Sequence, residues 1–336
     1  MQSLKGKRIL MFAPLFYGYE EVIKGKLVGS GAEVVLIYEN LEKVSSYYQF
    51  IKTKMPSKIS GKANEYYLKQ IKKHPFDYDY VFVIRGSFLS TETIDFMKQN
   101  FKKDCKYLLY QWDGVSNNKN ALNIAPLFDN VLTFDMQDSQ NLGWKYRQNL
   151  GWKYRPLFFI DSFIKDTEKD IDILYMCSLH SDRLRIFNEL KQLCASRDLN
   201  LKTFMYERRY VYLKRKYLDR KADYLSVSDS EVSYKPLTIR ESYELYGRAK
   251  VIVDYTHPRQ TGFTMRTIEC LGNRCKMVTN NLKVRNADFF SEDNIHVYSD
   301  NLEIADDFIS EPYKALDPSL YNYYSIDSFI SEIFAV

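Results

Sequence analysis

Arg266 and Glu269 lie three residues apart, which places both side chains on one face of a helix if this stretch is helical. Small residues precede them in the sequence: Thr261, Gly262 and Thr264. The unpaired N–H groups and the dipole of a helix start favour anions. The helix start would bind a phosphate of a nucleotide-sugar, and Glu269 would accept hydrogen bonds from a pair of its sugar hydroxyls. Arg266 would lie nearby. The alternative is an i,i+3 surface pair of Arg266 and Glu269 beside an ordinary turn.

The residues around this pair predict a strand, a loop, a short helix and a second strand. Residues 250–255 are apolar and β-branched, as in a strand buried on both faces. Thr264 is the expected N-cap of the helix, Gly272 and Asn273 are its expected end, and residues 277–279 begin the next strand. Open α/β sheets bind ligands beyond the carboxyl ends of their strands. The loop adds three polar candidates for such contacts: His257, Arg259 and Gln260.

A second group of polar residues follows the apolar segment 171–176. Arg183 is the candidate for a diphosphate, because its planar guanidinium pairs with two phosphate oxygens. Ser178 lies on the same predicted loop, and His180 either donates to phosphate or sugar or is an ordinary surface histidine. Both groups are therefore expected to contact one ligand.

Strands alternate with helical patterns along most of the chain, which predicts α/β architecture with parallel, doubly wound sheets. The predicted strands of the first half are 7–13, 32–38, 79–85, 106–111 and 130–134. The pattern restarts after Pro156, with strands at 171–176, 199–206, 250–255, 277–279 and 295–298. Residues 207–221 are a basic, tyrosine-rich helix candidate. The sequence thus predicts two Rossmann-like halves of five strands each.

The chain resembles GT-B glycosyltransferases, in which a glycine-containing loop leads into a helix whose glutamate grips the ribose. More narrowly, it resembles bacterial lipopolysaccharide and capsule biosynthesis proteins related to the CgeB-like glycosyltransferases. The matching pieces are YGYE (17–20), YQWDGVSN (110–117), LFDNVLTFDMQD (127–138), YRPLFF (154–159), DILYMCSLHSDR (172–183) and PLTIRESYELYGRAKVIVDYTHPRQTGFTMRTIECLG (236–272).

The resemblance implies a division of labour between two domains that face a cleft. Residues 1–160 would bind the acceptor, residues 161–312 would bind the nucleotide-sugar, and residues 313–336 would cross back to the first domain. The implied activity transfers a sugar to a glycan or lipid-linked acceptor in bacterial surface polysaccharide synthesis. The nucleotide is left open, with UDP favoured. A nucleotide-sugar epimerase or hydrolase and a non-catalytic sugar-nucleotide-binding subunit are the alternatives.

An inverting transferase needs a general base near the acceptor hydroxyl, at a strand end of the first domain. Asp113 and Glu20 fit that position, and Asp135 is a third option. Asp113 and Glu20 also have structural alternatives, since Asp113 would cap a turn with Gly114 and Glu20 would complement a helix dipole. A retaining enzyme would need no such base.

No cofactor is expected, and helix starts and arginines can offset the charge of a leaving diphosphate without a metal. Two D-x-D patterns, at 77–79 and 170–172, match the metal motif of another glycosyltransferase fold. Both precede predicted strands, at the end of a parallel sheet opposite to ligand sites.

The composition suits a cytoplasmic protein. A net charge of +5 is too small to indicate nucleic-acid binding, and five scattered cysteines without metal spacing indicate reduced thiols. The apolar run near the N-terminus is read as the first core strand instead of a signal peptide. The basic segments 52–73 and 207–221 leave open a peripheral contact with the inner face of the cytoplasmic membrane, against the alternative of solvated surface.

The octapeptide QNLGWKYR at 140–147 is repeated without change at 148–155. One short duplication is not a repeat architecture. We expect the additional residues to be accommodated in a surface loop or by a longer helix.

Overall fold

The chain was analysed as a computed structural model, which describes residues 4–39, 56–145, 151–179, 182–256, 262–299 and 302–336. These residues form two compact units. Unit 1 comprises Met1–Leu157 and Ile326–Val336, and unit 2 comprises Phe158–Ser325. Each unit is described by itself below.

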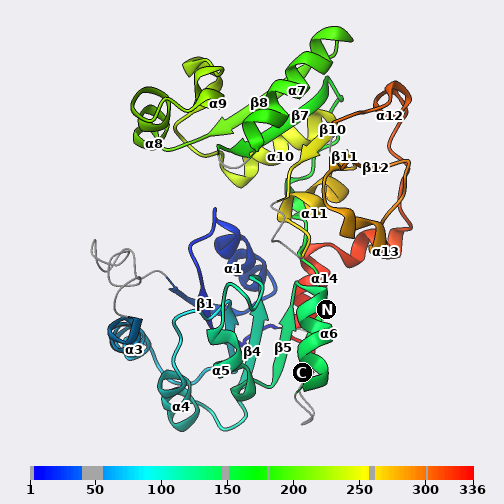
Figure 1. Ribbon diagram of the computed structural model, residues 1–336. Coiled ribbons are helices and arrows are strands. Elements are labelled where there is room, and N and C mark those ends of the chain that lie inside the picture. The colour runs from blue at the N-terminus through cyan, green and yellow to red at the C-terminus, as the bar shows by residue number, and fades with distance from the viewer. Residues whose placement is uncertain (1–3, 40–55, 146–150, 180–181, 257–261, 300–301) are drawn as a thin grey trace. The chain divides into compact units, whose positions relative to one another are not determined.

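Unit 1 is built on a parallel sheet of six strands (Figure 1). The strands are β1 (Arg8–Ala13), β2 (Glu33–Tyr38), β3 (Tyr80–Ile84), β4 (Lys106–Gln111), β5 (Asn130–Thr133) and β6 (Lys153–Tyr154). Their order in the sheet is β2-β1-β3-β4-β5-β6, and every pairing is parallel. The chain therefore places β2 on one side of β1 and then adds β3 to β6, in order, on the other side.

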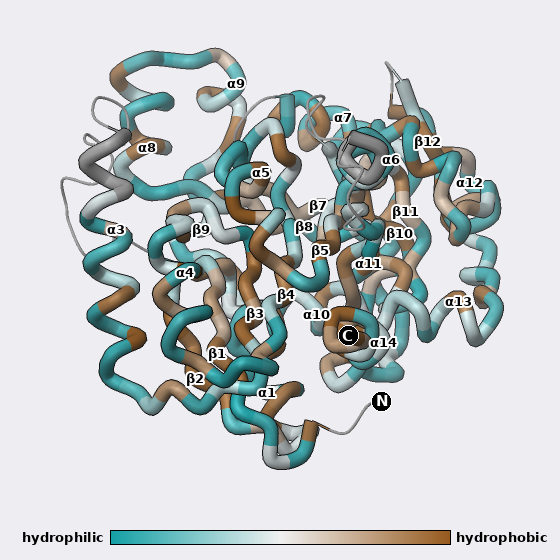
Figure 2. Tube along the Cα trace, turned by 90° about the horizontal axis from the view of Figure 1, so that it is seen from below, coloured by the Kyte–Doolittle hydropathy of each residue, from teal (hydrophilic) through white to brown (hydrophobic). Residues whose placement is uncertain are grey.

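Helices cover both faces of this sheet, because its strands are apolar on both sides. The helices of unit 1 are α1 (Tyr19–Gly29), α3 (Pro56–Ile71), α4 (Thr91–Asn100), α5 (Asn120–Ile124), α6 (Met136–Lys145) and α14 (Ile326–Ile333). Val81, Val83 and Leu109 share a buried cluster with apolar residues of α3, α4 and α5. In Figure 2 the strands β3 and β4 are largely hydrophobic, whereas α3 is mostly hydrophilic.

The last helix, α14, belongs to unit 1 although its sequence follows unit 2 (Figure 1). Phe329 packs on Tyr110 with ring centroids 4.7 Å apart, and Phe334 packs on Phe82 at 5.5 Å. These contacts lie on the sheet face opposite the α3–α5 cluster, since successive strand residues point to opposite faces. The C-terminal helix thus completes the core of unit 1.

Unit 2 contains a second parallel sheet of six strands. They are β7 (Ile171–Ser178), β8 (Leu201–Tyr206), β9 (Val232–Ser233), β10 (Ala249–Asp254), β11 (Lys276–Thr279) and β12 (Ile295–Val297). Their order is β12-β11-β10-β7-β8-β9, and all pairings are parallel. Read from β9, this is the 3-2-1-4-5-6 order of a dinucleotide-binding Rossmann sheet.

Helices also cover both faces of the second sheet. Those of unit 2 are α7 (Arg183–Ser196), α8 (Arg209–Leu213), a π-helix (Lys214–Leu218), α9 (Ala222–Leu225), α10 (Ile239–Arg248), α11 (Met265–Gly272), α12 (Asp306–Ser310) and α13 (Pro318–Tyr323). Apolar residues of α7, α9 and α12 share a buried cluster with alternate residues of β7 and β10. On the other face, α10 and α11 contact β10.

The prediction of two doubly wound parallel sheets is confirmed, but each sheet has six strands instead of five. The additional strands, β6 and β9, have two residues each and lie at sheet edges, so they are too short to produce a hydrophobic period. The helix predicted over 207–221 is also interrupted, because a π-helix and a break separate α8 from α9.

Candidate functional site

The ligand-binding end of unit 2 follows from its strand order. The chain leaves β7 toward β8 on one side and later returns to β10 on the other, so the order reverses between β7 and β10. In open α/β sheets, ligands bind outside the carboxyl ends of the strands at such a reversal. Ser178 ends β7 and Asp254 ends β10, so their side chains mark this position.

The side chain of Asp254 holds together the start of α11. Its Oδ1 accepts a hydrogen bond of 2.9 Å from Nη1 of Arg266, and its Oδ2 accepts one of 3.1 Å from the Thr264 hydroxyl. Asp254 is only 2% exposed, whereas the side chain of Arg266 retains 22% exposure. The guanidinium is therefore fixed at the edge of the protein interior.

Thr264 caps α11, as its sequence position predicts. Its hydroxyl accepts a hydrogen bond of 3.1 Å from the backbone N–H of Thr267 while donating to Asp254. The helix ends at Gly272, with Asn273 as its C-cap, which confirms the predicted stop. Gly272 is required by packing, since a Cβ atom there would lie 2.4 Å from the ring of Phe159.

Arg266 pairs with Asp254 and not with Glu269 at the protein surface. Burial opposes its charge, but Asp254 and Tyr246 outweigh burial and raise the pKa of Arg266 further above its ordinary value. Its Nε is buried and has no hydrogen-bond partner among the described residues. The side chain as a whole keeps 22% exposure, so part of this fixed cation is accessible to an anionic ligand.

Arg183 supplies a second guanidinium at the same end of the sheet. It begins α7, is partly buried, and donates a hydrogen bond of 3.1 Å to the backbone carbonyl of Ser178. Burial, reinforced by the like charge of Arg266, lowers the pKa of Arg183. Two neighbouring cations that are partly removed from water create a site that an anion stabilises.

Glu269 is almost fully buried in α11, at 3% exposure. Burial and the charge of Glu269 raise the pKa of Tyr243 and Tyr246 on α10, which shows that its carboxylate lies near that helix. The alternative of an exposed Arg266–Glu269 pair is therefore wrong. The ribose contact remains a prediction.

The remaining predicted donor contacts are only partly described. Gly262 is buried just before α11, and Ser178 is half-buried at the end of β7. The other five predicted contacts lie outside the described residues: His180, His257, Arg259, Gln260 and Thr261.

Unit 1 has its own strand-order reversal, between β1 and β3. The chain segments beyond the carboxyl ends of its strands carry three charged residues that interact. Glu39 directly follows β2, Arg85 directly follows β3, and Asp113 lies two residues beyond β4. In open α/β sheets this is the end at which ligands bind, and it is called the ligand end of unit 1 below.

Arg85 lies between the two carboxylates. Its Nε is 3.6 Å from Oε2 of Glu39 and 3.6 Å from Oδ2 of Asp113. The side chain of Glu39 is 2% exposed, whereas that of Asp113 is 41% exposed. Burial raises the pKa of Glu39 to about 7, against the opposing charge of Arg85 and hydrogen bonds from the N–H groups of Phe88 and Ser87.

The backbone of Arg85 is held in a left-handed conformation, with φ of 74°. Such a conformation is costly for a residue other than glycine and persists only where surrounding contacts impose it. The buried side chains of Gln111 and Asn118 each donate a hydrogen bond of 2.7 Å to the Arg85 carbonyl. Gly86 follows with φ of 66°, and a Cβ there would lie 2.7 Å from Cδ1 of Ile124.

The other base candidates of unit 1 have structural partners. Glu20 is 2% exposed, and its Oε2 accepts a hydrogen bond of 3.1 Å from the backbone N–H of Phe16. Asp135 is 1% exposed, and its Oδ1 accepts hydrogen bonds from the backbone N–H groups of Gln137 and Asp138 at the start of α6. Asp113 is the most exposed carboxylate of the three candidates.

Aromatic side chains lie beside Asp113. Phe16 packs edge-on against Trp112, with centroids 5.2 Å apart, and stacks on Tyr19 at 5.9 Å. Phe16 is half-buried, and Tyr17 is exposed at 60%. Such rings offer apolar faces to a sugar.

The carboxylates of the D-x-D patterns are occupied by cations at the amino ends of the sheets. Asp77 pairs with Arg8, and Asp79 with Lys102 at 3.1 Å. Asp170 pairs with Arg248 at 2.5 Å, and Asp172 with Lys250 at 2.7 Å. Within the described ranges, no group of three or more His, Cys, Asp or Glu side chains is arranged to hold a metal ion.

Sequence reasoning missed three residues of these two sites: Glu39, Arg85 and Asp254. Glu39 directly follows a predicted strand, Arg85 is the last residue of one, and Asp254 is the last but one, as in EVVLIYE, YVFVIR and VIVDY. A charged residue at the carboxyl end of a buried parallel strand was the available signal.

Comparisons with known proteins support the fold. No protein-family model and no curated protein sequence matches the chain. A glycosyltransferase from Rickettsia africae matches with a TM-score of 0.59 at 12% identity, covering 98% of this chain and 99% of that one. Anabaena Alr3699/HepE, solved with UDP-glucose, gives 0.54 at 11%, covering 97% and 98%. A UDP-GlcNAc 2-epimerase from Methanocaldococcus jannaschii gives 0.50 at 10%, covering 97% and 99%.

The chain has the GT-B fold. The matched structures include a glycosyltransferase and a nucleotide-sugar epimerase, so the likeness concerns architecture and does not select one chemistry. Within the described ranges, no helix has both the length and the hydropathy that a membrane crossing demands.

Proposed function

We propose that this protein is a glycosyltransferase that binds a nucleotide-sugar in unit 2 and transfers its sugar to a glycan or lipid-linked acceptor bound by unit 1. The biological role we propose is bacterial surface polysaccharide synthesis in the cytoplasm. The observation that carries the donor site is the pair Arg183 and Arg266 at the strand-order reversal of unit 2.

The two arginines are suited to the diphosphate of the donor. The partly exposed guanidinium of Arg266 and the start of α11 offer donors, and a guanidinium can form two parallel hydrogen bonds to phosphate oxygens. An anion between the two cations would also relieve the repulsion that contributes to the lowered pKa of Arg183. We propose UDP as the nucleotide, supported by the UDP-glucose complex of Alr3699/HepE.

The reaction proposed needs no metal or other cofactor. As the bond between the sugar C1 and the diphosphate breaks, the electron pair leaves with the diphosphate, where Arg183 and Arg266 offset the added charge. In unit 1, Asp113 is the proposed base that accepts the proton of the attacking acceptor hydroxyl. Its exposure permits that contact.

Nucleotide binding to matched arginine variants tests the donor site. Arg183 and Arg185 begin the same helix, but Arg185 pairs with Glu189 at 2.6 Å on the exposed side. We expect Arg183→Gln to weaken UDP binding at least 10-fold in calorimetric titration, since a charge-assisted hydrogen bond contributes about 1.5–3 kcal/mol. Arg185→Gln should bind UDP as the wild type does. Equal affinities of all three proteins would refute the assignment.

Product analysis separates transfer from the other chemistries of this fold. Incubation with UDP-GlcNAc or UDP-glucose, with and without octyl β-D-glucoside, distinguishes three outcomes. UDP release that depends on the acceptor supports transfer. A UDP-sugar epimer formed without acceptor would assign an epimerase, and UDP release without acceptor would assign a hydrolase. Binding without turnover would assign a non-catalytic subunit.

The stretch from α8 to α9 is the surface we propose for peripheral membrane contact. Four apolar or aromatic side chains are exposed there by half or more: Tyr210, Tyr217, Leu218 and Leu225. Five exposed cations accompany them without a carboxylate partner among the described residues: Arg208, Arg209, Lys214, Arg220 and Lys221. Only two acidic residues of this stretch, Asp219 and Asp223, oppose them. This combination fits an anionic membrane interface.

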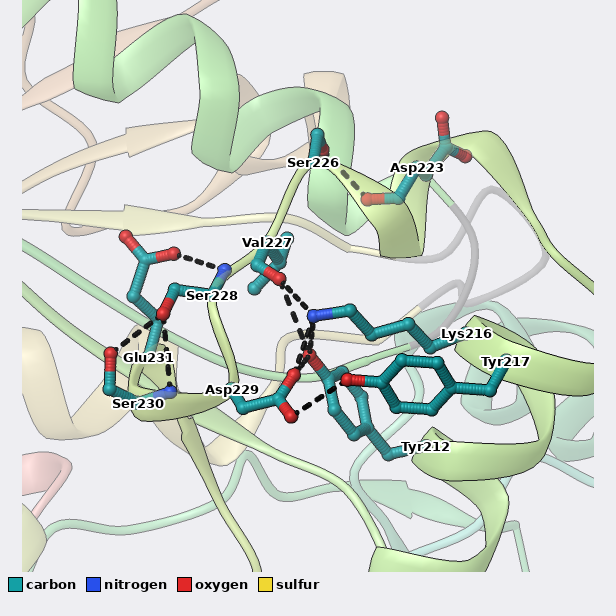
Figure 3. A network of polar contacts seen from close by, with 10 residues as sticks. All are labelled: Tyr212, Lys216, Tyr217, Asp223, Ser226, Val227, Ser228, Asp229, Ser230 and Glu231. Atoms are coloured by element: carbon teal, nitrogen blue, oxygen red, sulfur yellow. Dashed lines mark hydrogen bonds and ion pairs between the residues drawn. The ribbon is translucent and has the colours of Figure 1, made fainter.

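A polar network fixes the π-helix that presents these side chains (Figure 3). Lys216 donates hydrogen bonds of 2.6 Å to the Val227 carbonyl and 2.5 Å to Oδ1 of Asp229. The hydroxyl of Tyr217 donates to the other oxygen of Asp229 at 3.0 Å. Because Lys216 is turned inward, its neighbour Leu218 is left 75% exposed.

Vesicle co-sedimentation tests this surface. We expect the protein to bind vesicles of phosphatidylcholine with 30% phosphatidylglycerol and not vesicles of phosphatidylcholine alone, with binding reduced by salt. Leu218→Glu should lower binding at least 5-fold. Leu282→Glu is the matched control, because Leu282 is also exposed, at 57%, on another part of unit 2. Equal binding to both lipid mixtures, or equal loss in both variants, would contradict the proposal.

A further inference from the structure

Glu39 is a buried carboxylate at the ligand end of unit 1, and it has no role in the reaction proposed above. Its Oε1 accepts a hydrogen bond of 3.0 Å from the backbone N–H of Phe88. Its Oε2 is buried and has no hydrogen-bond partner among the described residues. That atom faces Nε of Arg85 at 3.6 Å, which is longer than a hydrogen bond.

Arg85 couples Glu39 to Asp113. The same Nε lies 3.6 Å from each carboxylate, so one cation is shared by a buried anion and an exposed one. Asp113 and Arg85 are the charged groups that face Glu39 among the described residues. Nε of Arg85 donates a hydrogen bond of 2.7 Å to the Ser87 hydroxyl, which holds the guanidinium within 3.6 Å of both carboxylates.

We propose that Glu39 is a positioning residue that acts through Arg85 to control the basicity of Asp113 toward the acceptor hydroxyl. This inference rests on the proposed transferase activity, in which Asp113 accepts the proton. When Glu39 is ionised, it neutralises Arg85, and Asp113 retains its affinity for a proton. When Glu39 is protonated, Arg85 is balanced by Asp113 alone, and this attraction lowers the proton affinity of Asp113.

The environment of Glu39 sets the pH range in which this carboxyl gains or loses its proton. Burial raises its pKa to about 7, so the carboxyl titrates where its neighbour must work. Glu39 is too buried for contact with an acceptor sugar, and its effect on the reaction is therefore electrostatic. The rate of transfer should rise as pH increases through about 7.

A pH series with Glu39→Gln tests the inference, because the amide mimics the protonated carboxyl without changing its shape. UDP release from UDP-glucose with octyl β-D-glucoside as acceptor is measured from pH 5.5 to 8.5. We expect kcat to fall about 2- to 3-fold at pH 8, as a fall of half a unit in the pKa of the base would produce, and the two proteins to become equal below pH 6. A loss that is the same at every pH would indicate a structural role and overturn the proposal.

Glu33→Gln is the matched control. Glu33 begins β2, at the opposite end of the strand that Glu39 follows, and its side chain is 75% exposed. This variant should retain the wild-type pH profile. A profile altered in the same way as that of Glu39→Gln would also overturn the proposal, since Glu33 does not contact Arg85.

A measurement without turnover separates this inference from the proposed function. The carboxyl resonance of Asp113 is followed by carbon-13 NMR of aspartate-labelled protein and assigned with Asp113→Asn. We expect the Asp113 pKa to be at least half a unit lower in Glu39→Gln than in the wild type. An unchanged Asp113 pKa overturns the coupling whether or not transfer occurs. A shifted pKa without UDP binding or transfer would refute the proposed function alone.

Discussion

The ion pair of Asp254 and Arg266 permits a quantitative test of how the donor site is built. Asp254→Asn removes the negative charge but keeps a similar shape and one acceptor oxygen. The variant leaves the Arg266 guanidinium, which is mostly buried, without its carboxylate. It also weakens the bond that Asp254 accepts from Thr264, the cap of α11.

The expected magnitude follows from the burial of the two partners. Removing one partner of a buried ion pair costs about 3–5 kcal/mol. The 22% exposure of Arg266 and the remaining amide oxygen reduce this cost, so we expect a loss of about 2–3 kcal/mol in the free energy of unfolding of unit 2. For a domain of this size the loss corresponds to about 4–12 °C in Tm.

The assay must report on unit 2 separately. All three tryptophans of the chain lie at positions 112, 144 and 152, in unit 1, so their fluorescence follows only that unit. Circular dichroism follows both units, and hydrogen exchange of peptides from β10 and α11 localises the loss. We expect the fluorescence transition of unit 1 to stay unchanged. The circular-dichroism transition of unit 2 should move to lower temperature, and hydrogen exchange in these peptides should be faster.

Two further variants decide whether the ion pair is the cause. Asp170→Asn is the matched control, because Asp170 also pairs with an arginine, Arg248, but both side chains are about half exposed. Its loss should be much smaller than that of Asp254→Asn, because solvent screens an exposed pair. In an Arg266→Gln background, Asp254→Asn should cost at least 1 kcal/mol less than in the wild type, on the order expected for contacting residues. Equal losses for Asp254→Asn and Asp170→Asn, or strict additivity, would refute the reasoning.

Two other predictions concern stability. Burial raises the Glu39 pKa from 4.5 to about 7, so the stability linked to its protonation is complete below pH 4.5 and lost as pH rises through 7. Glu39→Gln should therefore raise the free energy of unfolding of unit 1 by up to about 3 kcal/mol at pH 8 and by little at pH 4.5. Urea titrations that show the same gain at both pH values would contradict this prediction. Gly272→Ala should destabilise unit 2 by about 2 kcal/mol, because the new Cβ would clash with Phe159. Gly25→Ala in α1 is the control, since its Cβ meets no neighbour, and it should stabilise unit 1 by about 0.5–1 kcal/mol. Thermal melts in which both variants behave alike would show that the clash is absent.

Much of the fold could be predicted because it depends on local patterns. Apolar runs alternating with amphipathic segments indicated two parallel sheets, and all ten strands that they marked are present. The Thr264 cap and the stop after Gly272 were likewise readable, because capping involves residues within one helical turn. The two-residue strands β6 and β9 were not readable, since they are defined by their neighbours in the sheet.

The contacts within the sites were less predictable than their location. The sequence placed Arg266 at a helix start but did not reveal its partner Asp254, which is twelve residues earlier and becomes adjacent only when α11 packs beside β10. Glu39, Arg85 and Asp113 follow three different strands, and the parallel pairing of β2, β1, β3 and β4 brings the carboxyl ends of those strands together. Partner choice of this kind depends on strand order, which periodicity does not encode.

The duplicated octapeptide shows most directly that local sequence alone does not determine secondary structure. Lys145 of the first copy lies in α6, whereas Lys153 of the second copy, with identical neighbours on both sides, lies in strand β6. The second copy adopts the strand because it pairs with β5, where Arg155 donates a backbone hydrogen bond of 2.9 Å to the Thr133 carbonyl. Local sequence thus determined where helices and strands are possible and which residues carry charge at their ends. The tertiary structure alone decided which conformation one sequence takes and which charges meet, because hydrogen bonds and ion pairs between distant segments exist only after the sheets have formed.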